Sequence, residues 1–61
     1  MSKYKENDIV EITGNNNDHG FKIGEPVKVL EWDEQEYAWE CEGEHGETWW
    51  VLESDMKMKG A

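Results

Sequence analysis

Short stretches in which apolar and polar residues alternate, separated by polar clusters, run through this sequence and predict strands rather than helices. The stretches are rich in Val, Ile, Thr, Trp and Tyr, the residues that favour strands. A single helical turn is predicted at residues 53–56, where Ser54 or Asp55 is expected to bond free backbone donors. The predicted strands cover residues 8–13, 27–33, 37–42, 48–52 and 56–59.

The second predicted strand carries apolar side chains on both of its faces. Val27 and Val29 share one face, whereas Leu30 and Trp32 alternate with them and share the face of Lys28. A strand that bends around a small barrel can change partway along which face points inward. We therefore expect the apolar residues of this strand to change face near Leu30.

Glycine and asparagine mark the boundaries between the predicted strands. Residues 14–20 are dense in both, which predicts a long irregular loop after the first strand. Residues 43–46 supply a tight hairpin later in the chain. We predict a flexible lead-in at residues 1–7, in which Tyr4 can pack on the domain edge, a barrel at residues 8–59, and a frayed end at residues 60–61.

Trp49 and Trp50 are consecutive, so in a strand they point to opposite faces. We predict that Trp49 lies inside the barrel, on the same face as Val51, and that Trp50 lies outside. An outward Trp50 has two interpretations of equal weight. It covers an open end of the barrel, or it contacts a partner, because exposed aromatic residues are enriched at binding hot spots.

Five short strands, a long first loop and a helical turn before the last strand predict an all-β, five-stranded SH3-like barrel. The pattern His19-Gly20-Phe21-x-Ile23-Gly24-x-x-Val27-x-Val29, followed by Gly46-x-x-Trp49-Trp50-Val51-x-x-x-Asp55, resembles small acidic SH3-like barrel proteins encoded by bacteriophages. The resemblance covers about residues 8–58. The resemblance implies the fold and a viral origin but no defined activity. Some small acidic phage proteins of this kind disable host proteins.

The composition is that of a small folded domain inside a cell. A chain of 61 residues hides only about 60% of its unfolded surface, so its four tryptophans supply much of the core. The single cysteine, Cys41, excludes an intramolecular disulfide and favours a reducing compartment. No apolar run is long enough for a membrane helix and no signal peptide is recognisable, so we expect a soluble, cytoplasmic protein.

The charge is strongly negative and unevenly distributed. Six basic residues stand against 15 acidic ones, a formal net charge of -9, and no lysine or arginine occurs between Glu31 and Glu47. Such a chain is repelled by nucleic acids and anionic lipids and is attracted to basic surfaces. The acidic run either keeps an aromatic-rich domain soluble or binds a basic partner, and both interpretations remain open.

The residues do not favour catalysis or a metal site. Cys41, His45 and His19 are the only Cys and His residues, fewer than the four ligands of a structural zinc site. No nucleophile stands beside a base, and the carboxylates are expected to face water. We therefore expect a non-enzymatic protein without catalytic, metal or cofactor-binding residues.

We expect the protein to bind a host protein with a basic surface and to inhibit or redirect it. We expect it to be a monomer or weak homodimer and to bind neither nucleic acid nor membrane. Two alternatives are a mimic of nucleic acid, in which Glu40, Glu42 and Glu44 form a regular negative row, and an assembly protein that self-associates. The residues expected to bind the partner are Trp32, Glu34, Glu36, Tyr37, Glu40, Glu42, Glu44 and Trp50.

Overall fold

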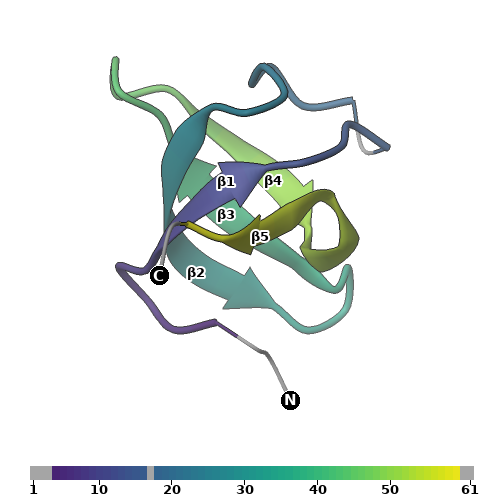
Figure 1. Ribbon diagram of the computed structural model, residues 1–61. Helices are drawn as coiled ribbons and strands as arrows, with labels where there is room; N and C mark the ends of the chain where they lie inside the picture. Colours follow the sequence, from purple (N-terminus) through teal and green to yellow (C-terminus); the bar gives the residue numbers. More distant parts are fainter. Residues whose placement is uncertain (1–3, 17, 60–61) are drawn as a thin grey trace.

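A computed structural model describes residues 4–16 and 18–59, in which five strands form a single antiparallel sheet (Figure 1). The strand order β4-β3-β2-β1-β5 and the helical turn between β4 and β5 confirm the predicted all-β, SH3-like barrel. The elements are β1 (Ile9–Ile12), β2 (Pro26–Asp33), β3 (Ala38–Glu42), β4 (Thr48–Leu52), the 3-10 helix η1 (Glu53–Asp55) and β5 (Met56–Met58).

The core lies inside the curved sheet and takes at least one side chain from every strand. Alternate residues of β1 and β2 point inward, as the two-residue period of a strand requires. The aromatic residues Phe21 and Trp39 complete it, and Tyr4 and Trp32 pack against its edge. The buried members are Val10, Ile12, Phe21, Val27, Val29, Trp39, Cys41, Val51 and Met56.

The predicted change of face in β2 occurs through a β-bulge. Val29 pairs with Cys41, but the next pair is Glu31 with Glu40, so Leu30 is an extra residue on β2. The extra residue reverses the alternation. Trp32 therefore lies on the inner side with Val29, opposite Trp39, and Glu31 lies on the outer side.

The prediction that Trp49 lies inside the barrel is wrong. Trp49 shares the face of Val51 as expected, yet 44% of its surface is exposed, whereas Val51 is fully buried. Its ring lies over Gly20, where an added Cβ atom would come within 2.5 Å of the indole. Trp49 thus covers the end of the barrel, beyond the reach of the small core.

The loop after β1 is far more ordered than an irregular loop. The fully buried carboxylate of Asp55 accepts hydrogen bonds from the backbone N–H and the side-chain amide of Asn16, at 2.9 and 2.7 Å. The Asp55 carbonyl accepts two more, from the backbone of Thr13 and Gly14. Asp55 was expected to bond donors of the helical turn, and it bonds the first loop instead.

His19 closes the same loop from the other side. Its buried ring bonds the Gly14 carbonyl through Nε2 (2.7 Å) and accepts the Phe21 N–H at Nδ1 (3.1 Å). These partners require the tautomer with its proton on Nε2. Asn15 adds bonds to both the N–H and the carbonyl of His19, so the loop is a hydrogen-bonded unit.

The described part of the predicted flexible lead-in is attached to the barrel. Tyr4 donates a hydrogen bond to the Met56 carbonyl at 3.3 Å, and the Asn7 N–H bonds the Val29 carbonyl at 2.7 Å. Tyr4 therefore packs on the domain edge, and Asn7 is tied to β2. The rest of the lead-in, residues 1–3, and the predicted frayed end, residues 60–61, lie outside the described residues.

Candidate protein-binding face

The outer side of β2, β3 and β4 brings together carboxylates that are separated in sequence. Strand register places Glu31 beside Glu40, and Glu40 beside Trp50, in one row across the three strands. The neighbouring rows are Lys28, Glu42 and Thr48 on one side and Asp33, Ala38 and Leu52 on the other. We call this surface the acidic face and define it as Glu31, Asp33, Glu36, Glu40, Glu42 and Trp50.

Trp50 stands beside a pocket at one end of the acidic face. Its side chain is 42% exposed, and with Ala38 and Leu52 it forms the apolar part of a pocket of about 270 Å³. Asp33 and Glu36 supply the carboxylates of the lining. One Asp33 oxygen accepts the N–H groups of Gln35 (3.0 Å) and Glu36 (3.4 Å), which fixes this carboxylate at the hairpin turn.

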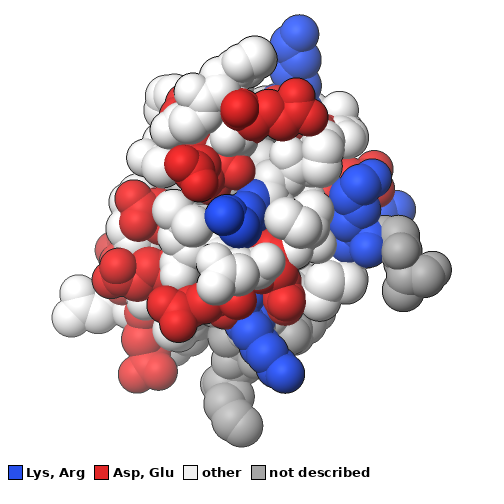
Figure 2. All heavy atoms as spheres, turned by 90° about the vertical axis from the view of Figure 1, so that its left-hand side faces the viewer, with Lys and Arg blue, Asp and Glu red and all other residues white. Residues whose placement is uncertain are grey.

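Within residues 4–16 and 18–59 the carboxylates of the acidic face form no ion pair, although Lys28 stands opposite Glu42. The ion pair that the structure does contain joins Lys57 to Glu11 across β5 and β1, at 4.0 Å. Like charges directly opposite on neighbouring strands destabilise a sheet, and Glu31 and Glu40 are such a pair. In Figure 2 acidic side chains extend from the upper part of the view to its lower left, with one lysine among them and the other lysines toward the edges of the view.

The predicted partner-binding residues divide into three places. Glu36, Glu40, Glu42 and Trp50 belong to the acidic face, and Glu34 is exposed on the turn beside it. Glu44 lies in the hairpin between β3 and β4 and shares a second pocket with Glu42. Trp32 and Tyr37 form the third place, away from Trp50.

Trp32 and Tyr37 do not share a surface with Trp50. Trp32 is half-buried on the inner side of the sheet, 5.5 Å from the ring centre of Trp39. Tyr37 contacts Trp32 edge-on at 6.2 Å and is 69% exposed. It precedes β3 with a φ of +54°, an uncommon conformation for a bulky residue, so its predicted place inside the third strand is wrong.

Glu31 and Asp33 are members of the acidic face that were not among the predicted partner-binding residues. Both belong to the acidic run, so their charge was visible in the sequence. Their position depends on the bulge at Leu30, because an uninterrupted β2 would place Glu31 on the side of Val29. The change of face that the apolar pattern already indicated is the signal that could have found them.

Chemically, the described residues offer binding groups. Burial, and secondarily the negative charge of Glu40, raise the pKa of the Cys41 thiol to about 12, so it stays protonated and unreactive at neutral pH. Burial raises the pKa of the Tyr4 hydroxyl, and the negative charge of Glu53 makes a smaller contribution in the same direction. Within residues 4–16 and 18–59, no three His, Cys, Asp or Glu side chains are grouped to hold a metal ion.

Comparisons with protein-family models, with curated proteins and with solved structures find no match to this chain. Among the described residues, no helix is long and apolar enough to cross a membrane.

Proposed function

We propose that this chain is a non-enzymatic binding protein that attaches its acidic face to a basic surface of another protein. The observation that carries the proposal is an exposed tryptophan, Trp50, that stands in one row with the unpaired carboxylates of Glu31 and Glu40. Tryptophan is enriched at the hot spots of protein interfaces, and polar residues form the rim around them.

The energetics of the acidic face favour a cationic partner. Glu31 and Glu40 repel each other in the free protein, and lysine or arginine side chains of a partner relieve that repulsion on binding. The net charge of -9 adds long-range attraction, which raises the association rate and weakens with salt. Trp50 supplies apolar contact area that does not depend on charge.

The resemblance to phage-encoded barrels suggests where the protein acts and on what. We propose that the chain is an accessory protein of a bacteriophage that acts in the host cytoplasm and inhibits or redirects a host protein. The high proportion of acidic residues is consistent with this proposal, because a protein so negative avoids nucleic acid while it searches for a basic protein surface.

Affinity capture from bacterial lysate tests this function. The immobilised protein is expected to retain a host protein at low salt, with less retained at moderate salt because ions screen surface charges. A charge-matched pair of variants shows whether the acidic face is responsible. Glu31→Gln with Glu40→Gln removes two face charges, and Glu6→Gln with Asp18→Asn removes two exposed charges elsewhere. Capture that both pairs reduce equally would contradict the proposal.

A second candidate function is mimicry of a nucleic-acid backbone. The row of Glu31 and Glu40 with the neighbouring row at Glu42 supports it, because carboxylates then repeat in two directions, about 4.8 Å between strands and about 6.6 Å along β3. Mimicry requires that the partner bind nucleic acid at the same site. Added DNA or RNA is expected to displace the protein from its partner, and a complex that resists an excess of both excludes mimicry.

A further inference from the structure

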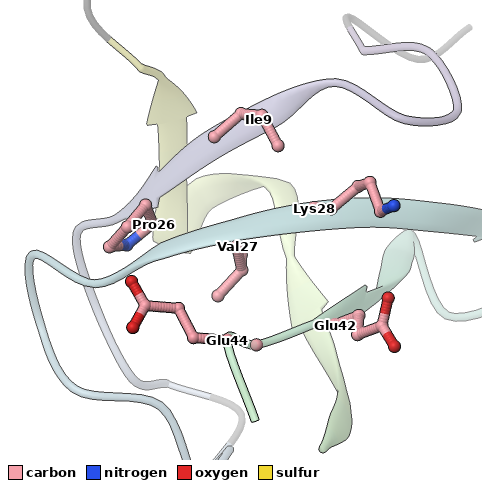
Figure 3. Close-up of a pocket in the computed structure, with 7 residues that line it drawn as sticks. Ile9, Pro26, Val27, Lys28, Glu42 and Glu44 are labelled. Atoms are coloured by element: carbon pink, nitrogen blue, oxygen red, sulfur yellow. The ribbon is translucent and has the colours of Figure 1, made fainter. Parts of the chain in front are cut away.

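A second pocket lies on the outer side of the barrel, where β1 and β2 meet the start of the β3–β4 hairpin (Figure 3). Its volume is about 340 Å³, and its floor is apolar. Ile9 is 45% exposed there, although it is a strand residue with a large apolar side chain. The full lining is Ile9, Pro26, Val27, Lys28, Glu42, Gly43 and Glu44.

The two carboxylates of this pocket lie at opposite ends, with Val27 between them (Figure 3). Lys28 lies at the Glu42 end, and the two residues are paired across β2 and β3. Their charged groups form no ion pair within residues 4–16 and 18–59. At the other end, Glu44 has no cation beside it in the lining of this pocket.

Glu44 also lines a neighbouring, more polar pocket of about 360 Å³. Two further carboxylates there are held in position by backbone donors. The Lys22 N–H bonds Glu25 at 3.0 Å, and the His45 N–H bonds Glu47 at 3.1 Å. Each carboxylate keeps a second oxygen that can accept hydrogen bonds from a cationic side chain.

Gly43 allows the two pockets to adjoin. A Cβ atom on Gly43 would lie 2.8 Å from the Phe21 ring and 2.9 Å from the Glu47 carboxyl group. Both distances are too short for a real side chain, so only glycine lets Glu47 fold back over the hairpin. An apolar pocket thereby opens directly beside a row of carboxylates at Glu44 and Glu47.

We propose that the apolar pocket receives an aliphatic side chain from a protein segment in which that residue is flanked by lysine or arginine. The exposed Ile9 and the half-buried Pro26 supply apolar surface that buries the aliphatic group, whereas Val27 is almost fully buried. A flanking cation reaches Glu44, which has no cation beside it in this lining, so the charges are complementary at that end. At the other end Lys28 already stands opposite Glu42, so the second cation contributes less there. This site deepens the proposed function, on which it rests, by naming the residue that anchors the basic partner.

An acidic segment does not fit the same pocket, because Glu42 and Glu44 would repel it. The net charge of -9 on each copy opposes a second copy of this chain at long range, although Lys57-Met58-Lys59 is a segment of the required chemistry. A purely basic segment satisfies the carboxylates but leaves the apolar floor exposed to water. The combination of one aliphatic residue with adjacent cations is what the lining selects.

Chemical-shift titration of the full chain with short peptides tests this site. The probe is acetyl-Lys-Leu-Lys-amide, and the comparison peptides are acetyl-Lys-Ser-Lys-amide and acetyl-Glu-Leu-Glu-amide. We expect the first to bind about tenfold more tightly than the second, because the leucine is partly buried. Backbone shifts are expected at Ile9, Val27 and Gly43, and the third peptide is expected to leave them unchanged.

A matched pair of variants separates the pocket from the rest of the surface. Ile9→Thr removes an apolar lining residue and keeps a β-branched residue in the strand. Met58→Thr changes a residue of β5 that is equally exposed, 46% against 45%, and lies outside the pocket. We expect Ile9→Thr to reduce the affinity for acetyl-Lys-Leu-Lys-amide about fivefold and Met58→Thr to leave it unchanged.

The outcomes distinguish the pocket from the acidic face. Equal affinity for the leucine and serine peptides, with shifts at Glu31 and Glu40, would overturn the pocket and leave the proposed function standing. Chemical-shift changes spread beyond both the pocket and the acidic face would also overturn the proposed site, as would the absence of binding by any peptide. The proposed function is tested separately, by the capture of a host protein and its loss in the charge-matched variants.

Discussion

The loop after β1 and the acidic face use polar residues in opposite ways. In the loop, His19 is buried, and the buried carboxylate of Asp55 in η1 accepts hydrogen bonds from Asn16 of the same loop. On the acidic face, Glu31 and Glu40 stand opposite each other on neighbouring strands, without a cationic partner among residues 4–16 and 18–59. Hydrogen-bonded polar groups in the first region stabilise the fold, whereas the charge in the second costs stability and is available to a partner.

The largest expected effect is at Asp55, where the comparison predicts a structural role. Asp55→Ala removes a fully buried carboxylate that accepts two hydrogen bonds from Asn16, and it leaves a cavity beside the loop. We expect a loss of about 3 kcal/mol in the free energy of unfolding, a large part of the total for so small a domain. Urea unfolding followed by tryptophan fluorescence measures it.

Two further variants control this measurement. Asp55→Asn keeps one acceptor oxygen and is expected to cost less than Asp55→Ala. Asp18→Asn changes an exposed residue of the same loop and is expected to stay within about 0.5 kcal/mol of the wild type. If Asp55→Ala were as mild as Asp18→Asn, the loop would not be organised by Asp55.

The next effect concerns Cys41, which lies in the core directly next to Glu40. Its pKa in the folded state, about 12, exceeds the ordinary value of 9.0, so the folded state retains the proton more strongly. This stabilisation is complete below pH 9 and is lost between pH 9 and pH 12. At pH 10 we expect a loss of about 1.4 kcal/mol.

The Cys41→Ala variant isolates this effect from the titration of lysine and tyrosine. Urea unfolding of the wild type and of Cys41→Ala between pH 8 and pH 11 gives the difference in their free energies of unfolding. We expect this difference to narrow as the pH rises. A constant difference over that range would show that the thiol ionises as easily in the folded state as in the unfolded one.

A smaller and opposite effect is expected on the acidic face. Glu40→Gln removes the like-charge repulsion with Glu31, so it is expected to increase the free energy of unfolding by about 0.5 kcal/mol. The increase should shrink in high salt, where the repulsion is screened. Glu6→Gln serves as the control, and equal gains in both variants would mean that net charge, not the strand pair, is responsible.

The smallest effect is expected at Tyr37. Tyr37→Asn relieves the cost of a positive φ, about 1 kcal/mol, and loses an edge-on contact with Trp32 of similar size. We therefore expect stability within about 0.5 kcal/mol of the wild type by urea unfolding. A loss above 1.5 kcal/mol would mean that the Tyr37 ring supports the core despite its exposure.

Local pattern was enough to predict much of the fold. The alternation of apolar residues predicts the strands to within one residue at each end. The same pattern indicates a change of face near Leu30, where the bulge occurs. It fails at Trp49 because the alternation predicts the face on which a side chain lies but not how deeply it is buried. Trp49 shares the face of Val51, yet it lies at the edge of the small core and is partly exposed.

The site was less predictable because it depends on pairing between strands. The acidic run was evident, but the row formed by Glu31, Glu40 and Trp50 requires the register of three strands and the bulge. The hydrogen bonds between Asp55 and Asn16 join residues 39 positions apart, and no local sequence pattern predicts them. Contacts of this kind are tertiary, so a single sequence leaves them undetermined.

The most direct test of the central claim is a comparison of two double variants at equal net charge. The partner recovered from lysate is titrated against Glu31→Gln with Glu40→Gln and against Glu6→Gln with Asp18→Asn, at low salt. We predict at least a tenfold weaker affinity for the first pair and a change below twofold for the second. Equal affinities would contradict the claim that the carboxylates of the acidic face form the binding site.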